Sequence, residues 1–372
     1  MIAIPTSLGR YPRVLLTTDT AGGVWTYAME LASALEGEGL GVTLAALGQE
    51  PSPGQRRDAE LRGLPLRSFR CRLPWMADPW SEVSAAGAWL LTLAQEVEAD
   101  VVHLNEPVLA ALAWPVPTVA VGHSCVLSWW EAVRGEPAPA QWGPYREAMR
   151  AGLAAADAVV APSRAMLEAL RRHYGTRHGL AIPNGRSAGR LGPEAKAGYV
   201  LVATRLWDEA KNARALDRAA AGLCWPVYAA GETISPDGQA MRLDNLTLLG
   251  PLDRRRLARW MSRAAIFALP AKYEPFGLSI LEAALAGCAL VLGDIPSLRE
   301  HWDGVAIFVA PDDPALLRLA LRSLIEDPQL RHTLAMRARR RALGYSARRM
   351  ALAYLRVYDA VLTRKQATAC AS

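Results

Sequence analysis

Cysteine is scarce in this 372-residue sequence, and lysine is scarcer still. No two of the five cysteines form a CxxC pair; they are Cys71, Cys125, Cys224, Cys288 and Cys370. Their scatter excludes a zinc ribbon and disfavours a secreted disulfide framework. The sequence also has no apolar run of membrane-spanning length and no basic segment followed by a signal-peptide core. We therefore expect a soluble cytoplasmic protein.

Arginine carries nearly all of the positive charge. Lysine supplies only four of the 42 basic residues, and the formal net charge is +6. Such a charge can attract nucleic acid or an anionic membrane surface. The densest basic run, from Arg337 to Arg341, falls in a helical pattern and is typical of a solvated face. We expect no nucleic-acid partner, and peripheral contact with acidic lipid on the inner face of a membrane stays an open alternative.

Short apolar runs alternate with longer helical patterns along the chain. This alternation predicts an α/β fold in which helices cover both faces of a parallel sheet. Residues 186–198 are small, polar and rich in glycine, as inter-domain linkers are. We expect two Rossmann-like domains facing a central cleft, at residues 1–190 and 191–345, and a C-terminal helix at 346–372 that packs back on the first domain.

The same patterns give the expected elements. In the first half we predict helices at 24–35 and 164–174 and strands at 13–18, 41–47, 101–104, 118–122, 158–161 and 180–182. In the second half we predict helices at 212–221, 254–262, 278–286, 314–326 and 347–362. The strands predicted there are 199–203, 227–230, 246–249, 265–269, 289–292 and 306–309.

Ligands of open parallel sheets bind beyond the carboxyl ends of the strands, so the residues after each strand are the candidates for a site. Gly22 and Gly23 follow the first strand, where paired glycines let a backbone approach an anion at a helix N-terminus. A tight strand–helix turn would also need glycine for steric reasons alone. His123 follows the strand at 118–122 and could bind a sugar hydroxyl, or simply cap the strand or bond to Ser124.

Two cations follow the first strand of the second half. Arg205 leaves the strand end, and Lys211 lies where the next helix begins. Together with a helix N-terminus they could clamp a diphosphate. The alternative is that they pair with Asp208 and Glu209 on the surface. For Lys211 the rarity of lysine argues against this, because it suggests a need for a compact point charge.

The most informative stretch runs from Glu274 to Glu282. Gly277 and Leu278 would open a helix whose free N–H groups point at an anion. Glu274 would lie just outside the helix and Glu282 somewhat more than one turn inside. Eight residues of helix span about 12 Å, which is comparable with a sugar–diphosphate–ribose unit. One carboxylate could then hold the sugar and the other the ribose, although two exposed glutamates on an amphipathic helix are the plainer alternative.

This segment resembles the E-x7-E motif of retaining glycosyltransferase family 4, the glycogen-synthase-like group with the GT-B architecture. The similarity extends over nearly the whole chain. It takes in Gly22-Gly23, the strand ending at His123, Val159–Ser163, Ile182–Gly185, Arg205 with Lys211, Leu249–Leu252 and Ala286-Gly287. Ala289 stands where the family often has proline.

The resemblance implies a role for each matching residue. Arg205 and Lys211 would bind the donor diphosphate, Glu274 the donor sugar and Glu282 the ribose. His123 would lie near the sugar and the acceptor. Backbone groups would complete the donor site: Gly22 and Gly23, with Phe276, Gly277 and Leu278, on the phosphate, and Leu252 on the base.

The expected activity is that of a retaining glycosyltransferase of the hexosyl type. Its donor would be a UDP- or GDP-linked sugar, and its acceptor a sugar, a lipid or a small molecule. No Asp-x-Asp sequence occurs, so we expect no metal and no bound cofactor. A GT-B sugar-nucleotide epimerase and a non-catalytic nucleotide-sugar-binding protein are the alternatives, and the oligomeric state is left unassigned.

Overall fold

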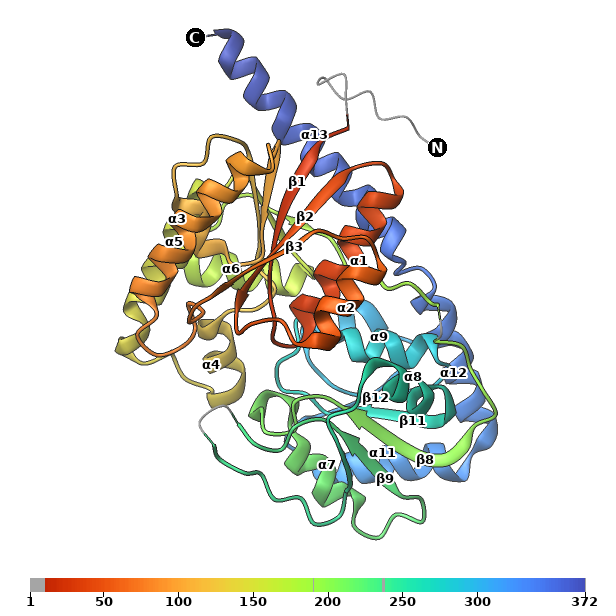
Figure 1. The fold of residues 1–372 in the computed structure, drawn as a ribbon. Coiled ribbons are helices and arrows are strands. Elements are labelled where there is room, and N and C mark those ends of the chain that lie inside the picture. The colour runs from red at the N-terminus through yellow and green to blue at the C-terminus, as the bar shows by residue number, and fades with distance from the viewer. Residues whose placement is uncertain (1–10, 190, 236–237, 372) are drawn as a thin grey trace. The chain divides into compact units, whose positions relative to one another are not determined.

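The chain divides into two compact units, which are described separately here. The computed structural model describes residues 11–189, 191–235 and 238–371. The N-terminal unit takes in the chain up to residue 128, residues 137–185, and the chain from residue 347 onward. The C-terminal unit comprises residues 129–136 and 186–346. Each unit is built around one parallel sheet (Figure 1).

The sheet of the N-terminal unit has seven strands in the order β3-β2-β1-β4-β5-β6-β7. They are β1 (Arg13–Asp19), β2 (Gly41–Gly48), β3 (Leu66–Arg70), β4 (Val101–Leu104), β5 (Thr118–Val121), β6 (Ala158–Ala161) and β7 (Leu180–Ala181). The helices are α1 (Gly23–Gly37), α2 (Pro53–Leu61), α3 (Trp80–Glu96), α4 (Val126–Arg134), α5 (Gly143–Ala155), α6 (Arg164–Tyr174) and α13 (Ala347–Ala371), with short 3-10 turns at Pro107–Ala111 and Ala140–Trp142. All neighbouring strands run parallel, so their carboxyl ends share one edge.

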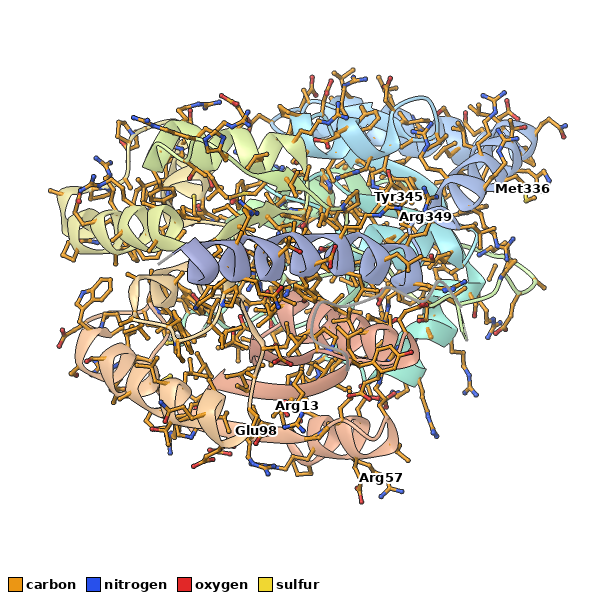
Figure 2. All side chains as sticks on the ribbon, turned by 90° about the horizontal axis from the view of Figure 1, so that it is seen from above. Arg13, Arg57, Glu98, Met336, Tyr345 and Arg349 are labelled. Atoms are coloured by element: carbon orange, nitrogen blue, oxygen red, sulfur yellow. The ribbon has the colours of Figure 1, made fainter. Side chains whose placement is uncertain are left out.

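The central strands form because they are buried on both faces. Every residue of β4 and of β5 is buried, as a central parallel strand requires. Side chains of α3, α5 and α6 form one apolar cluster with the sheet. Helix α1 packs against β1, β2 and α13 (Figure 1). At the amino end of β1, Arg13 forms an ion pair with Glu98 (Figure 2).

The sheet of the C-terminal unit has six parallel strands in the order β10-β9-β8-β11-β12-β13. They are β8 (Ala197–Ala203), β9 (Val227–Ala230), β10 (Thr247–Gly250), β11 (Ala264–Leu269), β12 (Ala289–Gly293) and β13 (Ile307–Val309). The helices are α7 (Ala213–Ala220), α8 (Arg254–Arg263), α9 (Leu278–Leu285), α10 (Pro296–Trp302), α11 (Pro314–Glu326) and α12 (Pro328–Ala342), with a 3-10 turn at Glu209–Lys211. Helices α7, α8, α9 and α11 all contact the sheet.

Every element predicted above has a counterpart among these helices and strands, with ends that differ mostly by one or two residues. The expected alternation missed α2, β3, α3, α4, α5, α10 and α12 as defined elements. The start of α2 could have been predicted, because Ser52 caps the helix, Pro53 is its first residue, and Gln55 completes a capping box with Ser52. The last helix extends well beyond its predicted end at residue 362.

Candidate active site

The carboxyl ends of β8 and β11 carry the first pair of candidate residues. These two strands are neighbours, so the loops that follow them emerge at the same edge. Lys211 closes the 3-10 turn after β8, and its Nζ donates to Glu274 Oε2 over 2.9 Å. Only 10% of the lysine side chain and 17% of the glutamate side chain are exposed. Lys211 and Glu274 therefore form a largely buried ion pair, and Glu209 is not the partner of this lysine.

Arg205 follows the surface alternative instead. Its guanidinium donates to Asp208 Oδ2 over 3.0 Å, and 47% of its side chain is exposed. It also lies over the Trp207 ring, 5.5 Å from the centroid. Asp208 is buried and accepts a second hydrogen bond from the amide of Ala210, so it fixes the turn that carries Lys211. The Arg205 guanidinium thus remains accessible to an anion, and its hydrogen bond to Asp208 holds it in place.

Helix α9 starts immediately after Gly277. That residue has φ 88°, a conformation that favours glycine, and an added Cβ would lie 2.6 Å from the Ile280 side chain. Phe276 is buried and its ring packs on His301 with centroids 4.8 Å apart. Its side chain therefore belongs to the core, and its amide donates to Glu274 Oε1 over 3.5 Å. The first backbone amides of α9 point out of the helix N-terminus. The amide of Leu278, the first residue of the helix, is among them, as expected.

Glu282 lies one turn inside α9. Its Oε1 accepts a hydrogen bond from Arg186 Nε over 2.7 Å, and the two side chains are 13% and 4% exposed. Two solvent-exposed glutamates are therefore not what the structure shows. Arg186 was placed in a polar linker by the sequence, but it is buried. Leu252 is half-buried beside the core at the start of α8.

In the N-terminal unit, the turn after β1 needs its first glycine. Gly22 has φ 83° and precedes α1, which begins at Gly23. Asp19, the last residue of β1, accepts a hydrogen bond from the amide of Ala21 over 3.0 Å. The steric explanation for Gly22 therefore holds, and the amides at the start of α1 remain suited to an anion.

His123 is held in one orientation by the residues around it. Its Nε2 lies 2.8 Å from Asn105 Oδ1, and its ring meets Tyr27 edge-on with centroids 4.5 Å apart. The amide nitrogen of Asn105 donates to the Thr17 carbonyl over 2.5 Å, which turns Oδ1 toward His123. Nε2 must then carry the proton, so Nδ1 is an acceptor. Burial lowers the pKa of His123 to about 3, so the ring is neutral near pH 7.

Behind His123 lies a second neutral histidine. His103, in β4, is fully buried between the hydroxyls of Tyr27 at 3.2 Å and Tyr358 at 2.7 Å. Burial, followed by the neighbouring His123, lowers the pKa of His103 to about 3. Tyr358 comes from α13, so the last helix is bonded to the centre of the N-terminal sheet.

The sequence analysis missed one carboxyl group at this edge. Glu106 follows β4, next to Asn105, and its neighbour at the end of β1 is Asp19. Burial, and then the charge of Asp19, raises the pKa of Glu106 to about 8. The carboxyl is therefore mostly protonated at neutral pH and can donate a hydrogen bond. The strand-end rule that selected His123 would also have selected Glu106.

The described residues contain no group of three or more His, Cys, Asp and Glu side chains placed to hold a metal ion. None of the helices in this part of the chain is long and apolar enough to cross a membrane.

Two family models of glycosyltransferases match parts of the chain. Residues 21–190 match the model of Glycosyltransferase Family 4, and residues 238–341 match that of the Glycosyl transferases group 1. The chain is therefore similar to the glycosyltransferases of family 4. Glycogen synthase of Mycobacterium tuberculosis is 41% identical over 95 residues, which are 25% of this chain and 23% of that protein. D-inositol 3-phosphate glycosyltransferase of Kineococcus radiotolerans is 31% identical over 125 residues, 31% of this chain and 29% of that protein.

These matches span less than a third of the curated relatives. Solved structures extend the likeness to the fold of nearly the whole chain. Sucrose-phosphate synthase of Thermosynechococcus elongatus superposes with a TM-score of 0.76 at 19% identity, covering 95% of this chain and 100% of the other. HepE of Anabaena, solved in complex with UDP-glucose, gives 0.75 at 18% identity, with 94% and 100% covered. The fold is therefore GT-B, as the sequence predicted.

The expected site residues form two groups, one in each unit. In the C-terminal unit the structure brings Lys211 to Glu274 and places the start of α9 between Glu274 and Glu282. In the N-terminal unit it brings His123 to Asn105. The roles of these residues stay predictions.

Proposed function

We propose that the protein is a retaining glycosyltransferase that moves a sugar from a nucleotide-diphosphate sugar to an acceptor hydroxyl. One observation carries the proposal: the buried ion pair between Lys211 and Glu274 beside the N-terminus of α9. A cation and a helix N-terminus suit a leaving diphosphate, and a carboxylate suits sugar hydroxyls. The ion pair puts both kinds of group within one hydrogen bond of each other.

The charge of the donor supports the same assignment. A leaving diphosphate carries about two negative charges that must be neutralised as the sugar departs. Lys211, the exposed Arg205 and the first amides of α9 supply positive charge from one edge of the C-terminal sheet. We take the donor to be UDP- or GDP-linked and the sugar to be a hexose. The complex of HepE with UDP-glucose favours a uridine nucleotide.

Two groups at the N-terminal site are poor general bases near pH 7. With its pKa lowered to about 3, His123 is a weak base, and Glu106, with its pKa raised to about 8, is mostly protonated. We propose that the leaving phosphate takes the acceptor proton during same-face attack, with retention of configuration. The sequence has no Asp-x-Asp, so we propose that Lys211 and Arg205 act without a divalent metal.

The N-terminal unit would bind the acceptor, which we take to be a sugar, a lipid or a small molecule. His123 Nδ1 can accept a hydrogen bond from a hydroxyl, and the protonated Glu106 can donate one. An acceptor hydroxyl could therefore donate a hydrogen bond to His123 and accept one from Glu106. A sugar-nucleotide epimerase has no support from the relatives named above.

The proposal is tested by ligand binding followed by turnover. A thermal-shift screen should show that a nucleoside diphosphate or its sugar raises the melting temperature. Release of the diphosphate from that sugar should then depend on an added acceptor. Conversion of the nucleotide sugar to its epimer without an acceptor would favour the epimerase. Binding without any turnover over a broad acceptor panel would favour a non-catalytic binding protein.

A further inference from the structure

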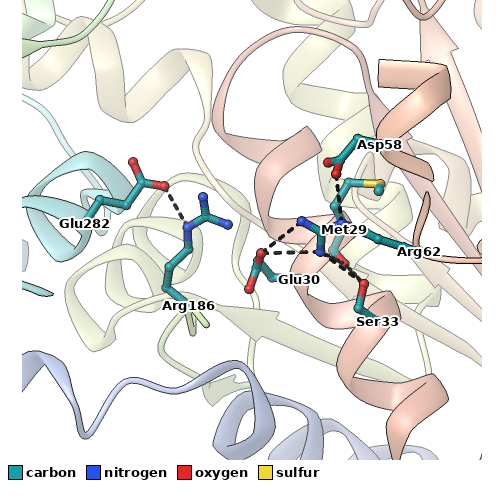
Figure 3. Close-up of polar contacts among 7 residues, drawn as sticks. All are labelled: Met29, Glu30, Ser33, Asp58, Arg62, Arg186 and Glu282. Atoms are coloured by element: carbon teal, nitrogen blue, oxygen red, sulfur yellow. Dashed lines mark hydrogen bonds and ion pairs between the residues drawn. The ribbon is translucent and has the colours of Figure 1, made fainter. Parts of the chain in front are cut away.

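The most unusual ion pair of the C-terminal unit joins Arg186 to Glu282 (Figure 3). Both side chains are largely buried, with 4% and 13% exposed. Removing charges from water is costly, and a buried ion pair is weak evidence for stability. Such a pair is better explained by what it orients than by the energy it adds.

Arg186 is fixed at its backbone as well as at its side chain. Its amide donates to the carbonyl of Tyr345 over 2.9 Å (Tyr345 is labelled in Figure 2). The arginine follows Pro183, Asn184 and Gly185, at the point where the chain enters the C-terminal unit. Its guanidinium therefore projects from an anchored position, and the hydrogen bond to Glu282 is set by the fold.

The ion pair engages one oxygen of the glutamate. Arg186 Nε donates to Oε1 over 2.7 Å (Figure 3). Oε2 accepts no hydrogen bond from the residues that the structure describes. The hydrogen bond to one oxygen restrains the carboxylate and leaves its other oxygen available as an acceptor.

The pair also changes the electrostatics of the donor site. A bare carboxylate beside a diphosphate would repel it, and more strongly in a partly buried place than in water. Arg186 neutralises Glu282 just as Lys211 neutralises Glu274. Each glutamate of the motif thus has a cation of its own from outside α9.

We propose that Arg186 is a positioning residue that orients and neutralises Glu282, so that the glutamate binds the ribose diol of the donor and makes the site selective for ribonucleotides. The inference rests on the proposed function, because it takes α9 as part of the donor site. The inference adds Arg186 to the donor site as a residue that contacts Glu282, and it explains why this arginine is buried.

The test compares the affinity of the full-length protein for UDP, GDP and ADP with that for their 2′,3′-dideoxy forms, measured by calorimetry. In the wild type, the tightest ribonucleotide should bind better than its dideoxy form. Arg186→Met should weaken the ribonucleotide by about tenfold, the equivalent of one good hydrogen bond to a charged group. The dideoxy form should weaken less, because it loses the neutralising charge but no contact with a ribose diol, so the preference for ribose shrinks.

Two further variants keep the result interpretable. Arg186→Lys restores the charge without the planar geometry, so it should recover affinity only in part; it also serves if the methionine variant fails to fold. Arg62→Met is the matched control, because Arg62 likewise pairs with a buried glutamate, Glu30, but in the N-terminal unit (Figure 3). This variant should bind nucleotides like the wild type.

The outcomes separate the inference from the function. If the wild type binds a nucleotide and Lys211→Ala abolishes that binding, the donor site stands. An unchanged ribose preference in both Arg186 variants would then overturn the role of Arg186 alone. Equal weakening of the ribo and dideoxy forms would overturn it too, because it would show a general charge effect. A wild type that binds none of the nucleotides would contradict the proposed function itself.

Discussion

Lys211 Nζ and Glu274 Oε2 lie 2.9 Å apart at the carboxyl edge of the C-terminal sheet, although 63 residues separate them in the sequence. The pair joins the turn after β8 to the loop after β11. In the proposed reaction the lysine would neutralise the leaving diphosphate, and the glutamate would hold the sugar as charge develops on it. The predictions below begin with this pair.

Replacing the cations should abolish most transfer while leaving the fold intact. Lys211→Ala and Arg205→Ala each remove positive charge from the leaving group, and a loss of about a hundredfold in turnover is expected. Steady-state kinetics with the identified donor measures it. Lys365→Ala is the control, since that exposed lysine bonds to the Pro115 carbonyl in the N-terminal unit, away from the candidate donor residues. Wild-type turnover in both site variants would remove the clamp assignment.

The two glutamates should differ in kinetic effect. Glu282→Ala should mainly weaken donor binding, because a ribose contact exists in both the ground state and the transition state. Glu274→Ala should mainly lower kcat, because the sugar acquires charge only as the reaction proceeds. Donor affinity and single-turnover rates distinguish the two. Normal nucleotide affinity in the Glu282 variant would show that this residue is misplaced.

The protonated Glu106 should leave a signature in stability against pH. Its folded-state pKa of about 8 lies above the ordinary value of 4.5. Between these two values the folded protein holds a proton that the unfolded chain has released, so its contribution is present below pH 4.5 and is lost as the pH rises through 8. Neutral Glu106→Gln should lack this loss.

Melting temperatures measured from pH 6 to pH 9 test this. The wild type should fall relative to the glutamine variant by at least about 2 °C over that range. His103 and His123 are common to both proteins and cancel in the difference. Parallel curves would mean that Glu106 is ionised in the folded state.

The sequence predicted the fold well because its central strands are buried on both faces. Continuous apolar runs such as those of β4 and β5 leave few alternatives. The edge strand β3 is only half-buried and was not recognised. Helix α3 was missed despite its apolar stretch at residues 85–91.

The site could be predicted residue by residue but not contact by contact. Strand ends and the E-x7-E spacing selected Lys211, Glu274 and Glu282, but nothing local links Glu282 to Arg186, which is 96 residues away. Arg186 lies in a small, polar stretch that is typical of a linker, and only tertiary packing buries it. The protonation of Glu106 likewise depends on burial, which no local pattern reveals.

The central claim is that the chain transfers a sugar with retention and without a metal. Proton NMR of the product formed from a nucleotide sugar and an acceptor, in excess EDTA, tests it most directly. The account predicts a new glycosidic bond that keeps the anomeric configuration of the donor, formed at an undiminished rate. A product with the inverted configuration, or transfer that appears only after Mn²⁺ or Mg²⁺ is added back, would contradict it.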